Sequence, residues 1–428
     1  MTIVFERQLD GEEGTHALVI GVGSYPHLAL PGLDPPDLES AVRGAIAFAD
    51  CLIRHADALT PRLATLDLLL SPPGGVPATY LPPDGSLTAA GAVDPRPDAS
   101  VEGAAEDNVE EAGLRWSTHL QATPDNVAVF YICGHGVATP SRMMVFLSDV
   151  KSKASRPWNP HVDVLVEAAR LHRRSSVALG CFFIDACQEV IKEVDLAEAD
   201  KQKIIRDPVE ILPPGPDDEN TNVYALVPGP RGALAWDDEH KVGGRFTQVL
   251  VQALDGAAAC NFTGVGNWGV KLDDLHSRMK LLYGLNPLWA DGKPFNPQPV
   301  YTPVARGPLV QFSSSPKVPV CIRFSPADIL TSAISLNFVA STIPPDPQIF
   351  ALTIDDHSGS ASVSGWKDGI FIAWPKASFG SHRMRLSWRV LEDGVSASSG
   401  QTWRNPDRET AVDISEMRVT PVVVHDVS

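Results

Sequence analysis

Residues 129–136 read VFYICGHG, and residues 182–188 read FFIDACQ. Both stretches begin with a run of apolar residues, which is typical of a buried β-strand, and both end beside a reactive side chain. Strands are expected at 126–133 and 177–184, and the spacing of apolar residues predicts a helix at 162–174 between them. A strand, a helix and a second strand in this order predict a parallel pair.

The same alternation of elements continues toward both ends of the chain. Further apolar runs predict strands at 16–24, 63–70, 142–150, 223–227 and 299–304. Apolar residues three or four positions apart predict helices at 38–53, 101–121, 245–254 and 272–285. Asp37 is placed to cap the first of these helices, and the Pro- and Gly-rich segment 72–99 is expected to be a loop. This pattern predicts an α/β fold, a three-layer α/β/α sandwich around a mostly parallel sheet.

The character of the sequence changes after residues 313–316 (SSSP), which we interpret as a linker. Short strand-like runs follow, separated by Gly, Pro, Asp and Ser, at 318–324, 334–339, 349–354, 369–374, 383–390 and 419–425. Such runs without a helical period are typical of a small antiparallel β-sandwich. We therefore expect two domains, at residues 1–312 and 317–428, and the total length of 428 residues also favours two.

Composition narrows the classes of partner and cofactor. The chain has 35 basic and 52 acidic side chains, a net charge of -17, which argues against nucleic acid as a partner. No apolar run approaches the roughly 20 residues of a membrane span, and the N-terminus lacks the pattern of a signal peptide. The six cysteines form no C-x-x-C pair, so neither a metal site nor a disulfide framework is expected. We expect a cytoplasmic protein without a cofactor.

His135 and Cys187 are the residue types of a thiol hydrolase. They follow the carboxyl ends of their strands, where open α/β sheets carry their functional residues. A thiol ionises only weakly at neutral pH, because its reference pKa is about 8.5. A nearby imidazole can take the thiol proton and later return a proton to a leaving amine. Their separation matches the roughly 50 positions between the catalytic residues of caspases.

The two motifs resemble the catalytic motifs of the caspase, metacaspase and separase clan, and residues 224–250 are similar to the clan's smaller catalytic half. The resemblance implies a caspase-like fold and a cysteine endopeptidase with His135 as general base and Cys187 as nucleophile. It also implies an oxyanion hole formed by the backbone N–H groups of Gly136 and Cys187. One departure is the sequence Gln-Glu-Val after Cys187, which lacks the glycine common in relatives.

The same resemblance bears on substrate choice. Asp185 stands two residues before Cys187, where caspases that cleave after aspartate have glutamine; Asp-x-Cys is similar to metacaspases and separase, which cleave after Arg or Lys. Trp236 and Asp237 resemble the substrate-binding strand, where caspases place Trp followed by Arg, and Asp34 is a third candidate wall. A carboxylate in the pocket would pair with a guanidinium or ammonium group. The alternative for Asp185 is a carboxylate that caps a backbone turn. The alternative for Asp237 and Asp34 is an acidic side chain in a solvated loop.

Segment 189–222 occupies the place of the link that caspases cut during activation, and Arg206 is the candidate for self-cleavage; an ordinary solvated loop is the alternative. The expected partners are a protein or peptide substrate and an activating or regulatory protein, with no nucleic acid and no membrane. Prokaryotic members of the clan often serve in antiviral defence or cell death. Two other hypotheses remain: a catalytically silent regulatory or binding protein, and a thiol transferase or amidase on the same scaffold. Intact His135 and Cys187 argue against the first.

Overall fold

The structure is a computed structural model of the 428-residue chain. It describes residues 3–28, 37–82, 99–123, 125–139, 142–155, 157–172, 177–188, 222–230, 243–262, 267–284, 293–301, 307–314, 316, 318–324, 333–342, 352–355, 371–377, 380–391, 403–404, 407–414 and 418–424. The chain divides into two compact units. The first comprises Met1–Asp255, Val270–Lys280 and Pro294–Gln311, and the second comprises the remaining segments, Gly256–Gly269, Leu281–Lys293 and Phe312–Ser428.

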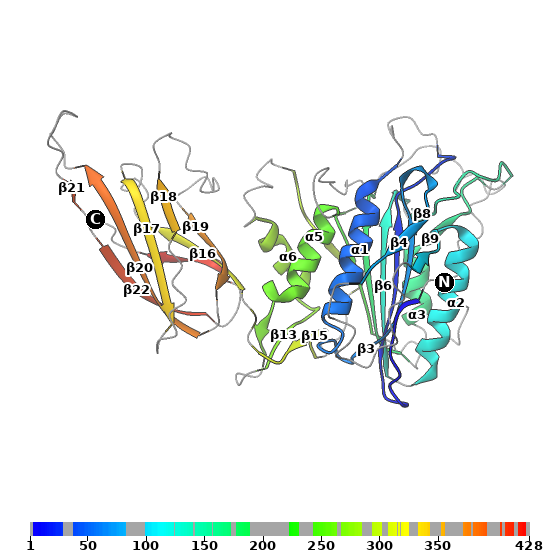
Figure 1. Ribbon diagram of the computed structural model, residues 1–428, viewed down its shortest axis with the longest axis horizontal. Helices are drawn as coiled ribbons and strands as arrows, with labels where there is room; N and C mark the ends of the chain where they lie inside the picture. The colour runs from blue at the N-terminus through cyan, green and yellow to red at the C-terminus, as the bar shows by residue number, and fades with distance from the viewer. Residues whose placement is uncertain are drawn as a thin grey trace. The chain divides into compact units, whose positions relative to one another are not determined.

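A seven-stranded sheet organises the first unit (Figure 1). Its order is β1 (Ile3–Glu6), β3 (Leu63–Ser71), β2 (Thr15–Val22), β6 (Asn126–Gly134), β10 (Val177–Ala186), β11 (Asn222–Val227) and β14 (Gln298–Tyr301). The five inner strands are parallel, whereas the two edge strands, β1 and β14, run antiparallel to their neighbours. The expected α/β fold with a mostly parallel sheet is confirmed.

Helices cover both faces of this sheet, because successive strand residues point to opposite sides. On one face, Phe48 of α1 (Glu39–Arg54) stacks on Tyr131 of β6, with ring centroids 4.6 Å apart. The Tyr131 hydroxyl lies 2.6 Å from the hydroxyl of Thr247 in α5 (Arg245–Gln252). The neighbouring strand residue, Phe130, turns to the opposite face and belongs to the core beneath α2 (Glu106–Ala122) and α3 (Val164–His172).

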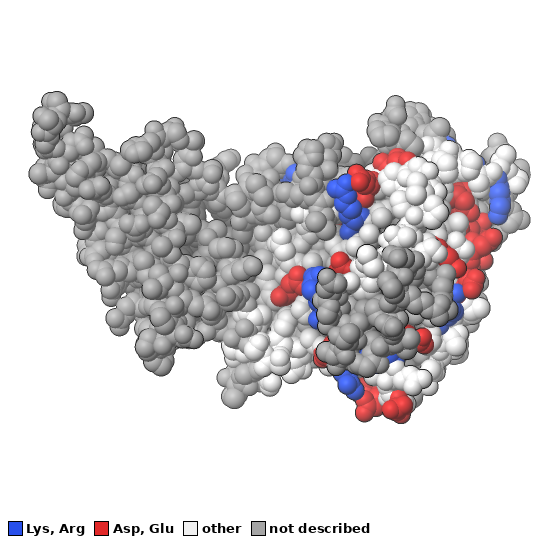
Figure 2. Space-filling model, viewed as in Figure 1, with Lys and Arg blue, Asp and Glu red and all other residues white. Residues whose placement is uncertain are grey.

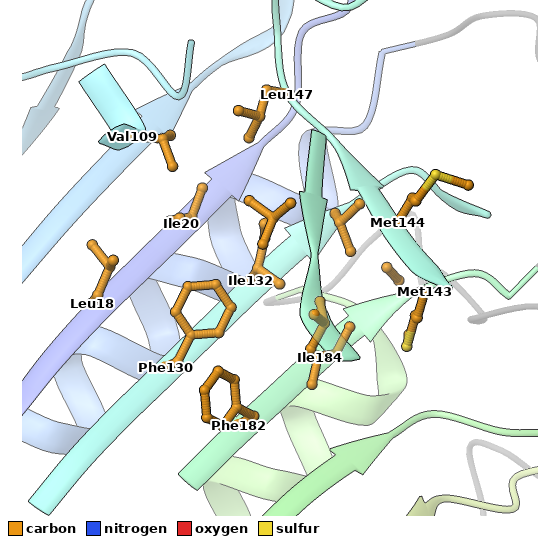
Figure 3. Packing of buried hydrophobic residues seen from close by; sticks show 14 of the residues in the cluster. Leu18, Ile20, Val109, Phe130, Ile132, Met143, Met144, Leu147, Phe182 and Ile184 are labelled. Atoms are coloured by element: carbon orange, nitrogen blue, oxygen red, sulfur yellow. The ribbon is translucent and has the colours of Figure 1, made fainter. Parts of the chain in front are cut away.

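The core on this second face is continuous from α2 across β2, β6 and β10 (Figure 3). Leu18, Ile20, Phe130 and Ile184 form its strand layer, and all four are fully buried. Burial of about 1.5–3 kcal/mol per large apolar side chain makes this face a major source of stability. The core therefore holds β2, β6 and β10 rigidly where their carboxyl ends meet.

A small antiparallel sheet follows β6 directly. It consists of β7 (Gly136–Ala138), β8 (Met143–Phe146) and β9 (His161–Asp163), in that order. The Phe146 N–H of β8 donates to the carbonyl of His135, the residue between β6 and β7, at 2.9 Å. The strand expected at 142–150 is present over a shorter range. The helix expected at 162–174 begins only at Val164, because β9 takes the preceding residues.

Several local elements differ from the expectation. Leu38 is the N-cap of α1 and makes no side-chain capping bond, so the capping role expected of Asp37 is wrong. Its carboxylate instead accepts the N–H groups of Tyr25 at 3.0 Å and Gly74 at 3.2 Å. The expected loop at 72–99 contains a 3-10 turn, η1, and two short strands, namely η1 (Pro73–Gly75), β4 (Ala78–Tyr80) and β5 (Ala99–Val101). The last two pair antiparallel.

Further elements that the structure describes before residue 313 are η2 (Ala253–Ala257), β13 (Trp268–Val270), α6 (Leu275–Gly284) and β15 (Val310–Phe312). In the second unit, β12 (Cys260–Asn261) pairs antiparallel with β13. None of the helices that the structure describes combines the length and apolar character that crossing a lipid bilayer requires.

The described residues after 317 form two sheets. One has the order β19 (Phe371–Ala377), β16 (Val318–Phe324), β23 (Arg418–Val424). The other contains β18 (Leu352–Asp355), β17 (Ala333–Thr342), β20 (Gly380–Leu391), β21 (Trp403–Arg404) and β22 (Asp407–Ile414). Every element that the structure describes there is a β-strand, but β16 and β23 are parallel, so the expectation of an antiparallel domain is wrong. The sandwich packing and the boundaries 1–312 and 317–428 stay predictions.

Candidate active site

The register of β6 and β10 brings the two predicted catalytic residues to one point. Asp185 pairs with Cys133 and Ala186 with Gly134, so His135 and Cys187 are the next residues of two adjacent parallel strands. His135 is 7% exposed, and Cys187 is partly exposed. Adjacent parallel strands lie about 4.8 Å apart, so the backbones of these two residues are neighbours. A proton exchange between them needs this proximity.

Gly136 lies directly against the backbone at Cys187. A Cβ atom at this glycine would stand 2.5 Å from the Cys187 carbonyl oxygen and 2.9 Å from the Ala186 Cβ. Real side chains do not tolerate such distances, so only glycine fits at this position. The two backbone N–H groups predicted to form an oxyanion hole therefore belong to segments in direct contact. Their action as oxyanion donors stays a prediction.

Tyr25 contacts both the backbone and the ring of His135, and the sequence did not indicate this contact. The His135 N–H donates to the Tyr25 hydroxyl at 2.8 Å, and the two rings lie 4.8 Å apart. The same hydroxyl donates to the Phe146 carbonyl, with its oxygen 3.4 Å from the acceptor. Burial raises the pKa of Tyr25 well above its usual value, so the phenol keeps its proton and can donate. Tyr25 follows β2, and only the pairing of β2 with β6 brings it to His135.

Asp185 is buried at the end of β10, with 4% exposure. Its Oδ2 accepts the Thr247 hydroxyl at 2.5 Å and the Thr247 N–H at 3.3 Å. Thr247 lies in the first turn of α5, whose N-cap Gly244 supplies no side-chain cap. Asp185 therefore satisfies an N–H group at the start of a helix more than 50 positions away, as a capping side chain does. Its substrate-binding role stays a prediction.

Gly244 and Gln188 extend the contacts between β10 and the following elements. A Cβ atom at Gly244 would stand 2.9 Å from Asp185 Oδ2, so glycine at the N-cap leaves the room that the carboxylate occupies. The Gln188 side-chain amide donates to the Gly229 carbonyl, just after β11. The residues on both sides of Cys187 are thus held by elements later in the chain.

The other predicted site residues lie outside the described residues. These are the candidate pocket residues Asp34, Trp236 and Asp237 and the candidate self-cleavage residue Arg206. The structure thus brings together His135, Gly136, Asp185 and Cys187, and it adds Tyr25 and Thr247, which no sequence motif marked.

Comparisons with known proteins give limited similarity. No family model matches the sequence. Over 87 residues the chain is 29% identical to the uncharacterized protein y4kE of Sinorhizobium fredii (strain NBRC 101917 / NGR234), a match that covers 20% of this chain and 25% of that protein. The match thus spans a quarter of the relative's length. A solved structure of pro-sf-caspase-1 is similar with a TM-score of 0.31 and 9% identity, over 71% of this chain and 90% of that one. Neither match identifies a family.

Proposed function

We propose that this protein is a cysteine endopeptidase that cleaves after a basic residue, with Cys187 as nucleophile and His135 as general base. The strongest support is the register of β6 and β10, which sets the two residues side by side at the carboxyl edge of the sheet. Functional residues of parallel α/β sheets gather at this edge.

The proposed chemistry proceeds through an acyl-enzyme. His135 takes the Cys187 proton, and the thiolate attacks the carbonyl carbon of the scissile peptide bond. The negative charge moves to the carbonyl oxygen, where the N–H groups of Gly136 and Cys187 stabilise it, by about 3 kcal/mol for each donor in comparable sites. As the C–N bond breaks, His135 gives its proton to the leaving amine. A water molecule, deprotonated by His135, then hydrolyses the thioester and restores the thiol.

Asp185 supports the choice of a basic residue. Its carboxylate is buried two residues before Cys187, and Thr247 holds one oxygen in place. Charge attraction is stronger in a desolvated site than in water, so a buried carboxylate there favours a guanidinium group over an aspartate side chain. Asp237, Trp236 and Asp34 belong to the same proposed pocket, which prefers Arg and accepts Lys less well.

Hydrolysis of matched fluorogenic peptides with Arg, Lys or Asp before the scissile bond tests this function. We expect cleavage after Arg and Lys by the wild type and by a Cys260→Ala control, and none by Cys187→Ala. Cleavage after Asp would agree with His135 and Cys187 as the catalytic pair but would contradict the acidic pocket. Equal activity of wild type and Cys187→Ala would remove Cys187 as the nucleophile.

Activation is part of the same proposal. We place it in segment 189–222, through self-cleavage after Arg206 or through a regulatory protein in a defence or cell-death response. The intact mass of the wild type, incubated alone, should convert to two fragments, whereas Cys187→Ala stays whole. An active protein whose mass never changes would contradict self-cleavage and leave activation by a partner.

A further inference from the structure

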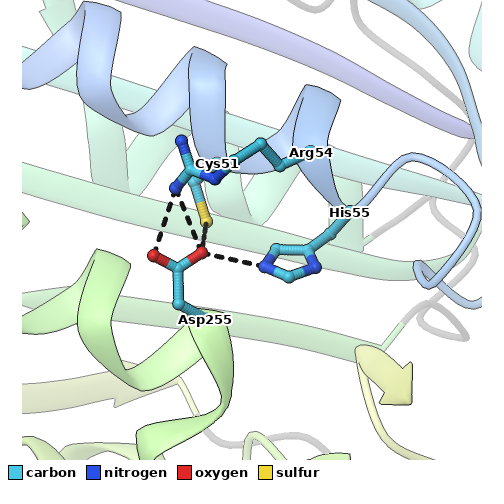
Figure 4. A network of polar contacts seen from close by, with 4 residues as sticks. All are labelled: Cys51, Arg54, His55 and Asp255. Carbon is cyan, nitrogen blue, oxygen red and sulfur yellow. Dashed lines mark hydrogen bonds and ion pairs between the residues drawn. The ribbon is translucent and has the colours of Figure 1, made fainter. Parts of the chain in front are cut away.

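A second polar cluster lies away from the His135–Cys187 dyad, where the ends of α1 and α5 meet (Figure 4). Cys51 and His55 are four positions apart, in the last turn and at the C-cap of α1. Asp255 lies in η2, a single π-helical turn that follows α5. Such turns are rare and occur frequently at functional sites. Figure 4 shows the three side chains pointing toward one another, together with Arg54.

One oxygen is the centre of this cluster. Asp255 Oδ1 lies 2.8 Å from His55 Nε2 and 3.7 Å from Cys51 Sγ. Arg54 donates to both carboxylate oxygens, at 3.1 Å each. A thiol, an imidazole and a guanidinium thus all direct a proton or a positive charge at the same carboxylate. A cation held by the same atoms would take the place of the thiol and imidazole protons.

The donor set is that of a zinc site. The ligating atoms of Cys51, His55 and Asp255 all lie within 4.8 Å of one another. Bonds of about 2.0–2.3 Å in a tetrahedral site put ligand atoms roughly 3.3–3.8 Å apart. The 3.7 Å between sulfur and oxygen already falls in this range, and the 2.8 Å between oxygen and nitrogen has to widen by about 0.5 Å.

Access and charge also fit an ion. Cys51 is 1% exposed and forms the buried end of the cluster, while the side chains of His55 and Asp255 are 18% and 39% exposed. A thiolate and a carboxylate would neutralise a divalent cation, with a neutral imidazole as third ligand and water as fourth. Arg54, 41% exposed, can keep Asp255 Oδ2 while Oδ1 turns to the metal.

We propose that Cys51 Sγ, His55 Nε2 and Asp255 Oδ1 form a binding site for a zinc-class divalent cation. Binding releases the thiol proton and shifts the imidazole proton to Nδ1, which leaves Nε2 free to ligate. The bound ion ties the end of α1 to the end of α5. The sequence predicted no metal site, because no C-x-x-C pair brings cysteines close together in the chain. Asp255 is 200 positions from His55, so no local motif marks this cluster.

Cobalt absorption tests the site in the full-length chain. The background is Cys187→Ala, because Cys187 and His135 are themselves a thiol and an imidazole. We expect one equivalent of Co²⁺ to give a thiolate-to-cobalt charge-transfer band and intense tetrahedral bands in the visible region, both displaced by Zn²⁺. Adding Cys51→Ser should abolish the charge-transfer band, and adding Cys260→Ser should leave it. A band that survives Cys51→Ser, or no saturable binding at all, would overturn the proposal.

A second variant covers the case in which Cys51→Ser does not fold. His55→Gln changes the partly exposed ligand and should weaken Zn²⁺ binding by about 100-fold or more, because loss of even an outer partner costs roughly 10–100-fold. Zn²⁺ should raise the thermal midpoint of the Cys187→Ala chain but not that of the chain with His55→Gln added. An exposed histidine, His27, gives the matched control as His27→Gln. Equal Zn²⁺ affinity in the His55 and His27 variants would contradict the site.

Discussion

Tyr25 supports the position of His135 directly. It accepts the His135 N–H, packs its ring on the imidazole and donates to Phe146 of β8. These three contacts fix the chain where β6 ends and β7 begins. A general base must stay within hydrogen-bonding reach of its partner, so loss of this support should act on the reaction before it acts on the fold.

Tyr25→Phe keeps the ring and removes only the hydroxyl. We expect kcat/KM for an Arg peptide to fall about tenfold, since one lost hydrogen bond of about 1.4 kcal/mol changes a rate by that factor. Circular dichroism should stay unchanged. Tyr80→Phe is the control, because the Tyr80 hydroxyl donates to Asp50 instead. Equal activity of the Tyr25 and Tyr80 variants would remove Tyr25 as a positioning residue.

Gly136 offers a steric test of the same place. Gly136→Ala would push a methyl group to 2.5 Å from the Cys187 carbonyl oxygen, so the two segments must separate. We expect peptide hydrolysis to be lost while the Zn²⁺ affinity of the Cys51 cluster stays as in the wild type. Gly307→Ala is the matched control, because the added Cβ meets nothing within 4 Å. Full activity in Gly136→Ala would show that this contact does not matter for the reaction.

At the scale of single residues, the motifs predicted that His135 and Cys187 follow strand ends on one edge of a parallel sheet, and the register of β6 and β10 agrees with that position. The motifs could not reveal Tyr25 or Thr247, since their contacts join segments that are 110 and 62 positions apart. For Asp37 the sequence predicted a contact that is not made. Its position before α1 is typical of a capping residue, but its carboxylate accepts the N–H groups of Tyr25 and Gly74 instead.

The start of α5 is the element most closely tied to the site. Its N-cap is a glycine, and the carboxylate of Asp185 takes the place of a capping side chain. Helix and strand thus depend on each other: the helix gains a partner for its N–H group, and the strand end gains a fixed carboxylate.

Thr247→Val removes the hydroxyl that holds Asp185 and keeps the shape of the side chain. We expect the free energy of unfolding to fall by about 2 kcal/mol, because the buried Asp185 carboxylate loses a donor and the buried Tyr131 hydroxyl loses its partner. KM for an Arg peptide should rise as the carboxylate moves. Thr247→Ser should restore both values. Thr118→Val is the control, since the exposed Thr118 hydroxyl donates to the Leu114 carbonyl of its own helix. No difference between the Thr247 and Thr118 variants would contradict the capping role.

Strand β9 makes stability depend on pH. Burial lowers the pKa of His161 to about 4, and the nearby charge of Arg142 acts in the same direction. Nδ1 lies 2.6 Å from the Trp158 carbonyl, and Nε2 has no partner among the described residues. The unfolded chain, with a histidine pKa of about 6.5, binds more protons than the folded chain below that pH. The contribution of neutral His161 to the free energy of unfolding is therefore fully present above about pH 6.5 and is lost as the pH falls toward 4.

His161→Asn keeps an N–H donor for Trp158 and removes the titrating ring. Between neutral pH and about pH 4 we expect the wild type to lose about 3 kcal/mol more stability than the variant. Urea midpoints at both ends of this range measure the difference. His27→Asn, which changes an exposed histidine, should follow the wild type. A steeper loss in His161→Asn than in the wild type would reverse the sign and contradict the account.

At the scale of elements, strongly apolar central strands were predicted within a few residues, since burial on both faces gives a continuous hydrophobic run. Edge strand β1 was missed because it is only four residues long and partly exposed. Parallel pairing of β16 with β23 was missed for another reason. The two strands are almost 100 positions apart, and local patterns do not report the direction of a distant partner.

For the whole molecule, charge agrees with the proposed substrate. The net charge is -17, and on the face in Figure 2 acidic side chains gather along the margin where α2 lies. An acidic protein attracts cationic peptides at long range and repels acidic ones. The composition of the sequence predicted this acidic character.

The most direct measurement compares the reactivity of the six cysteines across the whole chain. Alkylation by iodoacetamide, followed site by site with mass spectrometry, needs no known substrate. Cys187 and Cys260 are both partly exposed, so exposure alone predicts similar rates. We predict that Cys187 reacts at least about tenfold faster near neutral pH, because His135 takes its proton, and that His135→Asn removes the advantage. Equal rates at Cys187 and Cys260, or a rate at Cys187 that His135→Asn leaves unchanged, would contradict the dyad.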